Sequence, residues 1–273
     1  MFEHVTSKAK LCVSVASAPG NFGFKLHNHG YSLNKLDYLY IPLKVANIGS
    51  AIEAGKILGI VGMSVTMPFK AKAIDYLDEI EPIIERINSV NSILFKENKL
   101  YGYSTDYNSV RLNLSLIDSN KLRSVLILGS GGMARIFREV LIDLGCKEIY
   151  YWARKENPEF SKSANYINQK NIINFQNFNT LINATPIGME NVNSPLQLNL
   201  TKYKNLEMVI ESVSSPVKTD LVNQAVNLKL DTLIGAQLAF DQFLLQFRLY
   251  TDTELDRNIM KSFFELTVGY EIK

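Results

Sequence analysis

Apolar positions in the first hundred residues follow two alternating spacings. Compact apolar runs at residues 10–17, 38–43 and 59–65 are typical of strands, whereas residues 24–36 and 48–58 repeat apolar positions with helical spacing. Because strand and helix alternate, the pattern favours a mostly parallel sheet covered by helices.

Two further features of this half of the chain are a proline after the third strand pattern and a hairpin pattern. The third strand pattern stops at Met67-Pro68, and proline suits the first turn of a helix, where its missing N–H has no partner anyway. We therefore expect Phe69 and Lys70 near the positive end of a helix, where Lys70 would lose some proton affinity. Residues 91–95 and 99–103, with a polar turn between them, predict a hairpin.

A second series of strands and helices follows residue 106. Its strand patterns lie at residues 125–128, 148–152, 181–183 and 208–211, with a helix pattern at 133–144. This is a nucleotide-binding βαβ series, so residues 107–236 predict a Rossmann-type domain. Residues 237–273 show two helical stretches and no strand pattern, and we expect them to return to the domain of residues 1–106. The predicted fold class is α/β with two domains.

Composition excludes several classes of protein. Hydrophobic residues make up 47% and charged residues 21% of the 273 residues, which supports a packed core. Lys and Arg number 29 against 27 Asp and Glu, so the chain lacks the broad positive field of a nucleic-acid binder. No apolar run is long enough to span a bilayer, and the polar first ten residues lack a signal-peptide core. We expect a cytoplasmic protein, monomeric or homodimeric, with a small-molecule partner.

Cysteine and histidine patterns do not predict a redox or metal centre. Cys12 and Cys146 have no CxxC spacing and are interpreted as buried free thiols. His27 and His29 have no cluster of further ligands to complete a metal shell.

A glycine motif stands between an apolar strand pattern and an apolar helix pattern. Its residues, which fit G-x-G-x-x-A, are Gly129, Ser130, Gly131, Gly132, Met133 and Ala134. Such a turn lets the backbone approach a pyrophosphate at a helix N-terminus. The alternative is a glycine-rich turn with no ligand, and the order of strand, turn, helix and strand favours the binding interpretation.

Two cations follow the second strand of this series. Where an NAD enzyme presents an acidic residue to the ribose, the chain has Arg154 and Lys155. Both suit a 2′-phosphate and so favour NADP, although either residue alone could be a solvated surface charge.

Polar clusters end three strand patterns of the first domain. They are Ser64 to Lys70, Ser89 to Ser92, and Ser104-Thr105-Asp106. Ligands collect at the carboxyl ends of strands in such sheets, and a lysine beside an aspartate can exchange a proton with an alcohol or ketone. In isolation, Lys70 would be a surface residue and Asp106 a helix N-cap.

Five motifs in sequence resemble those of the shikimate dehydrogenase family, over nearly the whole chain. Residues 66–70 are similar to V-T-x-P-[FH]-K, residues 90–92 to A-V-N-T, residues 104–106 to N-T-D, residues 129–134 to G-A-G-G-A-[SA], and residues 182–189 to N-A-T-P-x-G-M.

The resemblance implies a role for each matching residue. Lys70 and Asp106 would be the catalytic pair, and Thr66, Asn91 and Gln242 would hydrogen-bond substrate hydroxyls. The residues implied for the cofactor, beyond the glycine motif and its cations, are Asn183, Ala184, Thr185 and Gly235.

The chain departs from the family pattern around the substrate. The S-x-S loop for the substrate carboxylate is replaced by Asn21-Phe22-Gly23, so an Asn21 amide and a Gly23 N–H stand in for two hydroxyls. Ser64 replaces an asparagine, and Ser214 stands where the family has tyrosine. These changes resemble a divergent shikimate dehydrogenase-like branch that carries an N-F-G loop.

Several functions follow as hypotheses. The first is reversible reduction of 3-dehydroshikimate with NADPH, as in aromatic amino acid biosynthesis. The others are oxidation of quinate or a related polyol acid such as an aminoshikimate, a non-catalytic NADP-responsive module, and a bifolate-type dehydrogenase of similar build.

Overall fold

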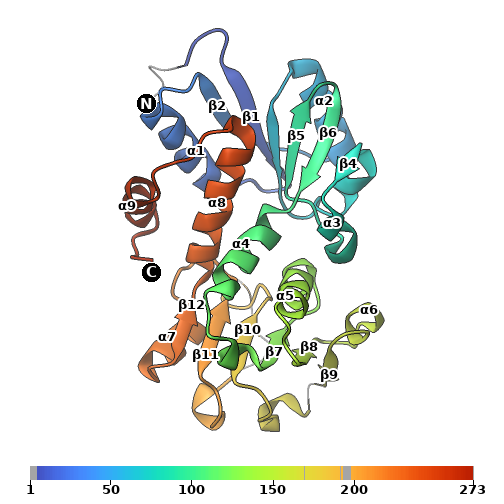
Figure 1. Cartoon of the computed structure of the whole chain (residues 1–273), viewed down its shortest axis with the longest axis vertical. Helices are drawn as coiled ribbons and strands as arrows, with labels where there is room; N and C mark the ends of the chain where they lie inside the picture. The colour runs from blue at the N-terminus through green and yellow to red at the C-terminus, as the bar shows by residue number, and fades with distance from the viewer. Residues whose placement is uncertain (1–4, 169, 191, 193–197, 273) are drawn as a thin grey trace. The chain divides into compact units, whose positions relative to one another are not determined.

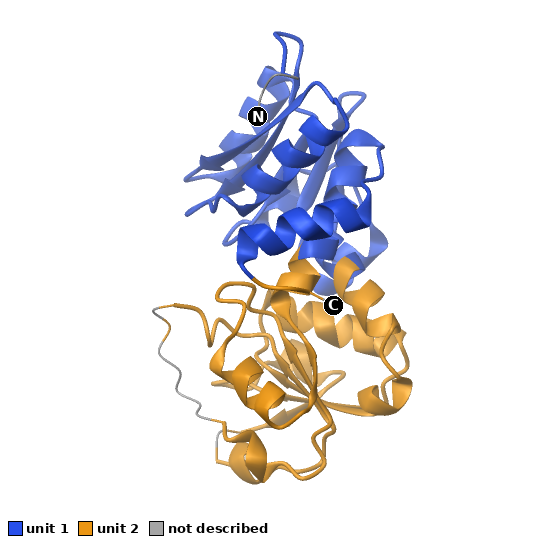
Figure 2. Cartoon of the chain, turned by 90° about the vertical axis from the view of Figure 1, so that its left-hand side faces the viewer, with its two compact units in different colours: residues 1–108, 240–269 blue, residues 109–239, 270–273 orange. Residues whose placement is uncertain are grey.

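The chain forms two compact units, each with its own sheet. The computed structural model describes residues 5–168, 170–190, 192 and 198–272. Unit 1 holds residues 1–108 and 240–269, and unit 2 holds residues 109–239 and 270–273 (Figure 2). The domain boundaries predicted from the sequence, at residues 106 and 236, fall within two helices that continue past both boundaries.

Unit 1 is a mixed six-stranded sheet in the order β2-β1-β3-β5-β6-β4. Its strands are β1 (Lys10–Ala16), β2 (Tyr38–Lys44), β3 (Gly62–Val65), β4 (Glu79–Ile80), β5 (Ser92–Lys96) and β6 (Lys99–Tyr103). The three strands β2, β1 and β3 are parallel, while β5 runs antiparallel to both β3 and β6. The predicted hairpin is confirmed, and it is the hairpin that makes this sheet mixed.

Helices cover this sheet. They are α1 (Phe22–Leu33), α2 (Ile48–Leu58), α3 (Pro82–Ile87) and α9 (Arg257–Val268), with the 3-10 helix η1 (Lys72–Tyr76). The helices α4 (Thr105–Ser115) and α8 (Gly235–Thr251) each begin in one unit and end in the other. Apolar side chains of β1, β3 and β5 pack against α2 in the core, where Val13, Ile52 and Met63 are at most 2% exposed. The late helix α9 lies beside α1 (Figure 1), and the rings of Phe22 and Phe264 meet edge to face. The C-terminal helices thus return to the first domain, as predicted.

One local prediction is wrong. Pro68 does not begin a helix: after β3 the Phe69 N–H bonds to the Thr66 carbonyl (3.0 Å), which closes a turn. Helical bonding starts only with the Ala73 N–H to the Phe69 carbonyl, and η1 begins at Lys72. Because the turn uses the Phe69 amide first, Lys70 precedes the helix and does not lie in its first turn.

Unit 2 is a parallel six-stranded sheet in the order β12-β11-β10-β7-β8-β9. Its strands are β7 (Ser124–Leu128), β8 (Glu148–Trp152), β9 (Asn165–Ile167), β10 (Thr180–Asn183), β11 (Met208–Glu211) and β12 (Asp231–Leu233). Its helices are α5 (Gly132–Asp143), α6 (Pro158–Ser161) and α7 (Asp220–Asn227), with 3-10 helices η2 (Ser119–Leu122), η3 (Ile172–Asn174) and η4 (Leu200–Lys202). The first strand lies next to the fourth, which is the doubly wound Rossmann order, and the strand order reverses between β7 and β10.

The burial of the unit 2 sheet on both faces explains why its strands have unbroken apolar sequences. Both faces of a doubly wound sheet are covered, and Val125, Leu126, Ile127 and Leu181 are completely buried. The cysteine prediction is half wrong: Cys12 is buried, whereas Cys146, in the loop between α5 and β8, is only partly buried.

Candidate functional site

A lysine and an aspartate form a close ion pair in unit 1. Lys70 lies in the turn after β3 and Asp106 in the first turn of α4, and Lys70 Nζ lies 2.5 Å from Asp106 Oδ2. Their side chains are 27% and 16% exposed. The pair is therefore partly shielded from water yet open to a ligand, and a charge-assisted hydrogen bond fixes the ammonium.

The hydroxyl of Thr105, beside Asp106, joins side chains from two distant segments. It accepts hydrogen bonds from Asn91 Nδ2 (2.9 Å) and Gln242 Nε2 (3.0 Å), while the Thr105 N–H donates to Asn91 Oδ1 (2.8 Å). The structure thus brings Asn91 and Gln242 together next to the ion pair. Thr105 was not among the predicted site residues, although its place directly before Asp106 was a signal in the sequence.

The remaining substrate candidates of unit 1 lie around β3. Ser64 and Thr66 are both partly buried, and the Thr66 N–H donates to the Val15 carbonyl (3.1 Å). Burial raises the pKa of the Tyr40 hydroxyl to about 12, opposed by hydrogen bonds with Ser64 and Ser14. Ser64 therefore has a protonated tyrosine as its neighbour, a partner that sequence reasoning missed.

The N-F-G segment forms the start of α1. Asn21 is exposed just before the helix, and its side chain makes no capping hydrogen bond. Gly23 lies against Tyr40, because a Cβ at Gly23 would be 3.2 Å from the tyrosine oxygen. The Asn21 amide and the N–H groups of the first turn thus offer donors to an anion, although they replace two serine hydroxyls.

The glycine motif of unit 2 makes the turn between β7 and α5. Gly129 has φ +111°, a conformation that favours glycine, and its N–H donates to the Trp152 carbonyl (2.7 Å). A Cβ at Gly131 or Gly132 would meet nothing within 4 Å, and Gly131 caps α5 without a side-chain bond. Open space beside free helix N–H groups fits a pyrophosphate. Ala134 is fully buried, as close packing of helix on strand requires.

The turn after β10 lies directly against the glycine motif. A Cβ at Gly129 would be 3.1 Å from both the Ala184 carbonyl oxygen and the Thr185 methyl group. Asn183 has an internal role: its amide donates to Glu211 and to the Ile187 carbonyl, and its oxygen accepts from Thr185. Ala184 and Thr185 therefore face the motif, while the buried Asn183 side chain holds their turn in shape.

The cation positions and Gly235 also lie in unit 2. Arg154 and Lys155 follow β8, both are exposed, and neither makes an ion pair within the residues that the structure describes. Gly235 begins α8, and a Cβ there would lie 2.3 Å from the Val213 carbonyl oxygen. Ser214, next to Val213, is exposed.

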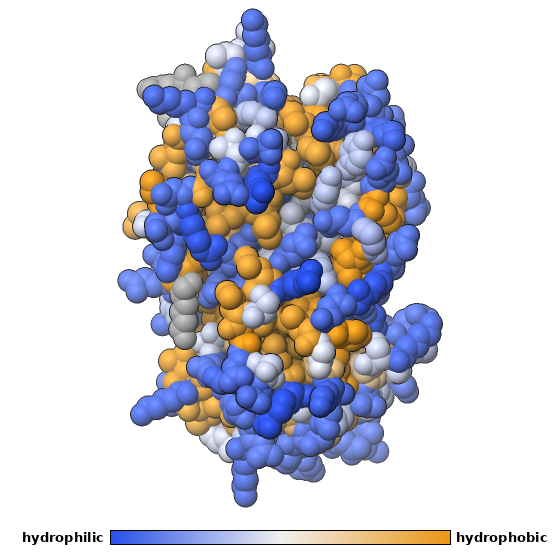
Figure 3. Space-filling view, in the orientation of Figure 1, coloured by the Kyte–Doolittle hydropathy of each residue, from blue (hydrophilic) through white to orange (hydrophobic). Residues whose placement is uncertain are grey.

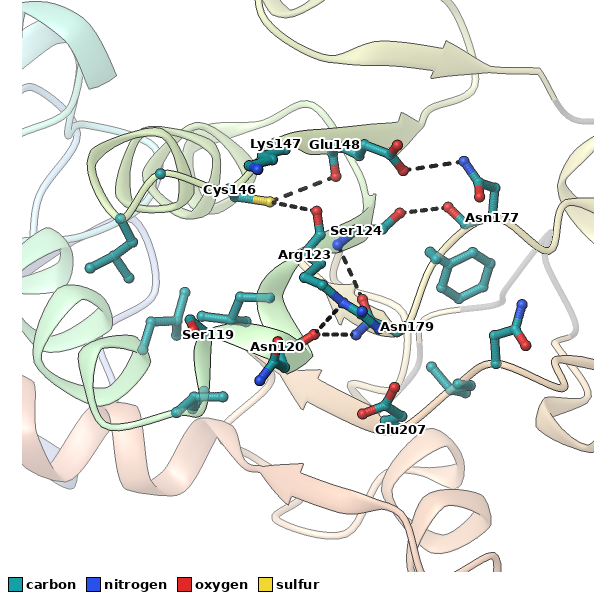
Figure 4. A pocket seen from close by; sticks show the side chains of 18 of the residues that line it. Ser119, Asn120, Arg123, Ser124, Cys146, Lys147, Glu148, Asn177, Asn179 and Glu207 are labelled. Carbon is teal, nitrogen blue, oxygen red and sulfur yellow. Dashed lines mark hydrogen bonds between the residues drawn. The ribbon is translucent and has the colours of Figure 1, made fainter.

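A cavity of about 990 Å³ opens at the opposite edge of the same sheet (Figure 4). Its lining includes Arg123, Ser124, Glu148 and Asn179, which stand at the amino ends of the strands. The Cys146 thiol hydrogen-bonds the Arg123 and Glu148 carbonyls there (3.7 Å each), and burial raises its pKa. Since the glycine motif lies at the carboxyl ends, this cavity is separate from the candidate dinucleotide site.

Hydrophobic and hydrophilic residues are mixed over the face shown in Figure 3. Among the described residues, no helix combines the length and the apolar character needed to cross a bilayer.

Known proteins resemble this chain along most of its length. The family model for the shikimate dehydrogenase substrate binding domain matches residues 22–93. A shikimate dehydrogenase-like protein of Haemophilus influenzae is 31% identical over 250 residues, covering 90% of this chain and 92% of that protein. A shikimate dehydrogenase (NADP(+)) of Methanosphaera stadtmanae is 29% identical over 248 residues, covering 85% and 87%.

The three-dimensional structure is also similar to a solved structure of this family. The solved structure of a shikimate 5-dehydrogenase-like protein superposes with a TM-score of 0.86 and 28% identity, covering 97% of this chain and 99% of that one. Together with the 31% identity to the Haemophilus influenzae protein, this shows that the chain belongs to the shikimate dehydrogenase family.

Proposed function

We propose that the protein is an NADP-dependent oxidoreductase that interconverts 3-dehydroshikimate and shikimate by reversible hydride transfer. The Lys70–Asp106 pair beside the Asn91–Thr105–Gln242 cluster carries the proposal. Relatives of similar length named shikimate dehydrogenase (NADP(+)) support it.

In this proposal Lys70 exchanges a proton with the reacting oxygen. During oxidation of the alcohol the hydroxyl proton passes to a basic group, and during reduction a proton returns to the carbonyl oxygen. Asp106 holds Lys70 Nζ in place through their 2.5 Å contact. Asn91, Gln242 and Thr66 supply the hydrogen bonds that orient the other hydroxyls of the ring.

The proposed cofactor contacts are confined to unit 2. NADP would supply the hydride acceptor. The N–H groups at Gly131 and Gly132 would bind its pyrophosphate, because this turn has free donors and open space. Arg154 and Lys155 are placed after the second strand, where a 2′-phosphate is recognised in this fold.

A second substrate is favoured by the N-F-G segment. Asn21 and Gly23 replace two hydroxyls, and their amide and N–H donors present a different geometry to a carboxylate. Quinate or another cyclic polyol acid is therefore the alternative substrate, with the same Lys70 and Asp106 chemistry.

The test is the initial rate of NADP+ reduction with shikimate and with quinate, for wild type, Lys70→Ala and Lys72→Ala. We expect Lys70→Ala to lower kcat at least about a hundredfold while leaving the Kd of NADP+ unchanged, because the variant loses only proton exchange. Lys72 is the matched control, since it is 65% exposed and pairs with Asp75.

Equal rates in Lys70→Ala and wild type would refute the role of Lys70. If the wild type binds NADP+ but oxidises neither polyol, the proposed activity is wrong and a non-catalytic NADP-responsive module is favoured instead.

A further inference from the structure

A buried polar chain runs from the substrate-binding cluster into the interior of unit 1. Gln246 lies one turn after Gln242 on α8, so both amides face the same side of the helix. Gln246 is 3% exposed, and its partners Ser92 and His27 are at most 1% exposed. Buried polar groups require complete hydrogen bonding, so the arrangement of this chain is strongly constrained.

Gln246 bridges two partners. Its Nε2 donates to Ser92 Oγ (2.7 Å), and its Oε1 lies 3.3 Å from His27 Nε2. Ser92 Oγ in turn lies 3.1 Å from Thr105 Oγ1, the hydroxyl that accepts from Asn91 and Gln242. Four hydrogen bonds therefore connect His27, on α1, to Gln242.

The environment of His27 bears on which groups donate and which accept along this series of hydrogen bonds. Its ring stacks on Tyr40 (4.2 Å between centroids) and contacts Phe243 edge to face, and burial lowers its pKa to about 3. The ring is therefore neutral. With Gln246 Oε1 as its partner, neutral His27 carries its proton on Nε2, and the other end of the same amide donates to Ser92 Oγ.

The Thr105 end is equally constrained. Its oxygen has two lone pairs, and Asn91 and Gln242 each donate to one. The Thr105 proton must then go to Ser92 Oγ or Asn91 Oδ1, which lie 3.1 and 3.2 Å away. Gln242 is thus held by one N–H, and its Oε1 is directed away from Thr105.

We propose that Gln246 and Ser92 are positioning residues that fix which end of the Gln242 amide is presented to the substrate. This inference rests on the proposed function only in taking the ligand to be a polyol acid. With Gln242 so held, its Oε1 accepts a hydrogen bond from a ligand hydroxyl. Asn91, whose oxygen is already occupied by the Thr105 N–H, offers only a donor. The site therefore selects a ligand that donates at one position and accepts at the other.

The first test reads the Gln242 side chain without any substrate. In nitrogen-15 NMR spectra of the full chain we expect one sharp pair of Gln242 amide resonances in the wild type. In Gln246→Met, which keeps the volume and removes both hydrogen bonds, this pair should broaden or split. Gln237→Met is the matched control, because Gln237 lies on the same helix and bonds to Asn113 (3.1 Å) instead.

The second test separates positioning from folding. For the polyol that the wild type oxidises, Gln246→Met should raise KM about tenfold, the loss expected for one misplaced hydrogen bond, with kcat and the Kd of NADP+ within about twofold. Ser92→Ala should raise KM to a similar extent. Ser92→Thr should keep the wild-type KM, since threonine retains the hydroxyl. The double variant Gln246→Met/Ser92→Ala should be no worse than either single variant, because both interrupt one chain.

Unchanged Gln242 resonances in both Gln246→Met and Ser92→Ala would overturn the inference. So would an unchanged KM, or additive losses in the double variant. If Gln246→Met does not fold, Ser92→Ala interrupts the same chain one bond later and decides the question. A wild type inactive on shikimate and quinate would refute the proposed function alone, because the NMR result does not depend on turnover.

Discussion

At the scale of single residues, glycines in this protein serve two opposite purposes. Gly235 permits close approach of two backbone segments, since a Cβ would lie 2.3 Å from the Val213 carbonyl oxygen. Gly131 leaves open space beside a helix N-terminus, with nothing within 4 Å of a Cβ. Glycine is required by packing at Gly235, whereas at Gly131 it leaves the space that the proposed cofactor would occupy.

The two glycines should respond differently to the same substitution. Gly235→Ala should lower the free energy of unfolding by about 1–3 kcal/mol, because backbone must move to admit the methyl group. Gly131→Ala should leave stability nearly unchanged but weaken NADP+ binding about tenfold or more, as the methyl group occupies the pyrophosphate space. Urea unfolding and fluorescence titration measure the two effects. Equal NADP+ affinity in Gly131→Ala would contradict the proposed cofactor position.

At the scale of elements, α1 links the Asn21-Phe22-Gly23 segment to the core. Its Asn28 side chain bonds the backbone N–H and carbonyl of Tyr40 in β2, at 2.9 Å each. One turn of the helix therefore carries the exposed Asn21 donors, and the next carries buried groups, including His27, that hold the helix to the sheet. The position of the loop depends on this attachment.

The buried histidine of α1 should make stability depend on pH. An unfolded histidine binds a proton near pH 6.5, whereas burial lowers the pKa of His27 to about 3. Between these values the unfolded state binds more protons, so the free energy of unfolding falls as the pH decreases. The tyrosines around the ring, Tyr31, Tyr40 and Tyr250, have raised pKa values and stay neutral in this range.

We expect a loss of about 2 kcal/mol between pH 7.5 and pH 5, at 1.36 kcal/mol per pKa unit. Urea unfolding at several pH values measures it. His27→Gln should flatten this part of the profile, whereas His29→Gln, on the same helix but stacked on Phe263, should keep most of the slope. An equal slope in wild type and His27→Gln would show that His27 is accessible to protons.

At the scale of the whole molecule, each compact unit carries one set of the proposed ligand-binding groups. The Lys70–Asp106 pair and the Thr105 cluster belong to unit 1, and the glycine motif with its neighbouring turn belongs to unit 2. Each unit has its own hydrophobic core, so each can present its groups on a rigid scaffold.

Hydrogen exchange should therefore report each ligand in a different unit. NADP+ alone should slow exchange at residues 129–134 and 183–185, and shikimate alone should slow it around Asn91 and Thr105, because bound ligands reduce local opening. Exchange measured by mass spectrometry resolves these peptides. Protection of residues 129–134 by shikimate alone would contradict the assignment of ligands to units.

The sequence by itself determined most elements and the candidate residues of both sites. Strand and helix spacing is local, so the series in unit 2, the hairpin of unit 1 and the glycine turn could be read directly from the order of residues. The ion pair of Lys70 with Asp106 followed from their motifs, each placed after a strand. These features depend on neighbours in sequence or on motif order.

Only the tertiary structure decided how the polar side chains are used. Thr105 and Gln246 have hydrogen-bond partners up to 219 residues away in the chain, and no local sequence pattern indicates which amide meets which hydroxyl or ring. The Asn183 side chain bonds to Glu211 in β11 as well as to its own turn, and Pro68 lies in a turn because the Phe69 amide bonds to Thr66. Periodicity records which face of an element is buried; hydrogen-bond partners are chosen only when separate elements meet, since each buried donor and acceptor must then be satisfied.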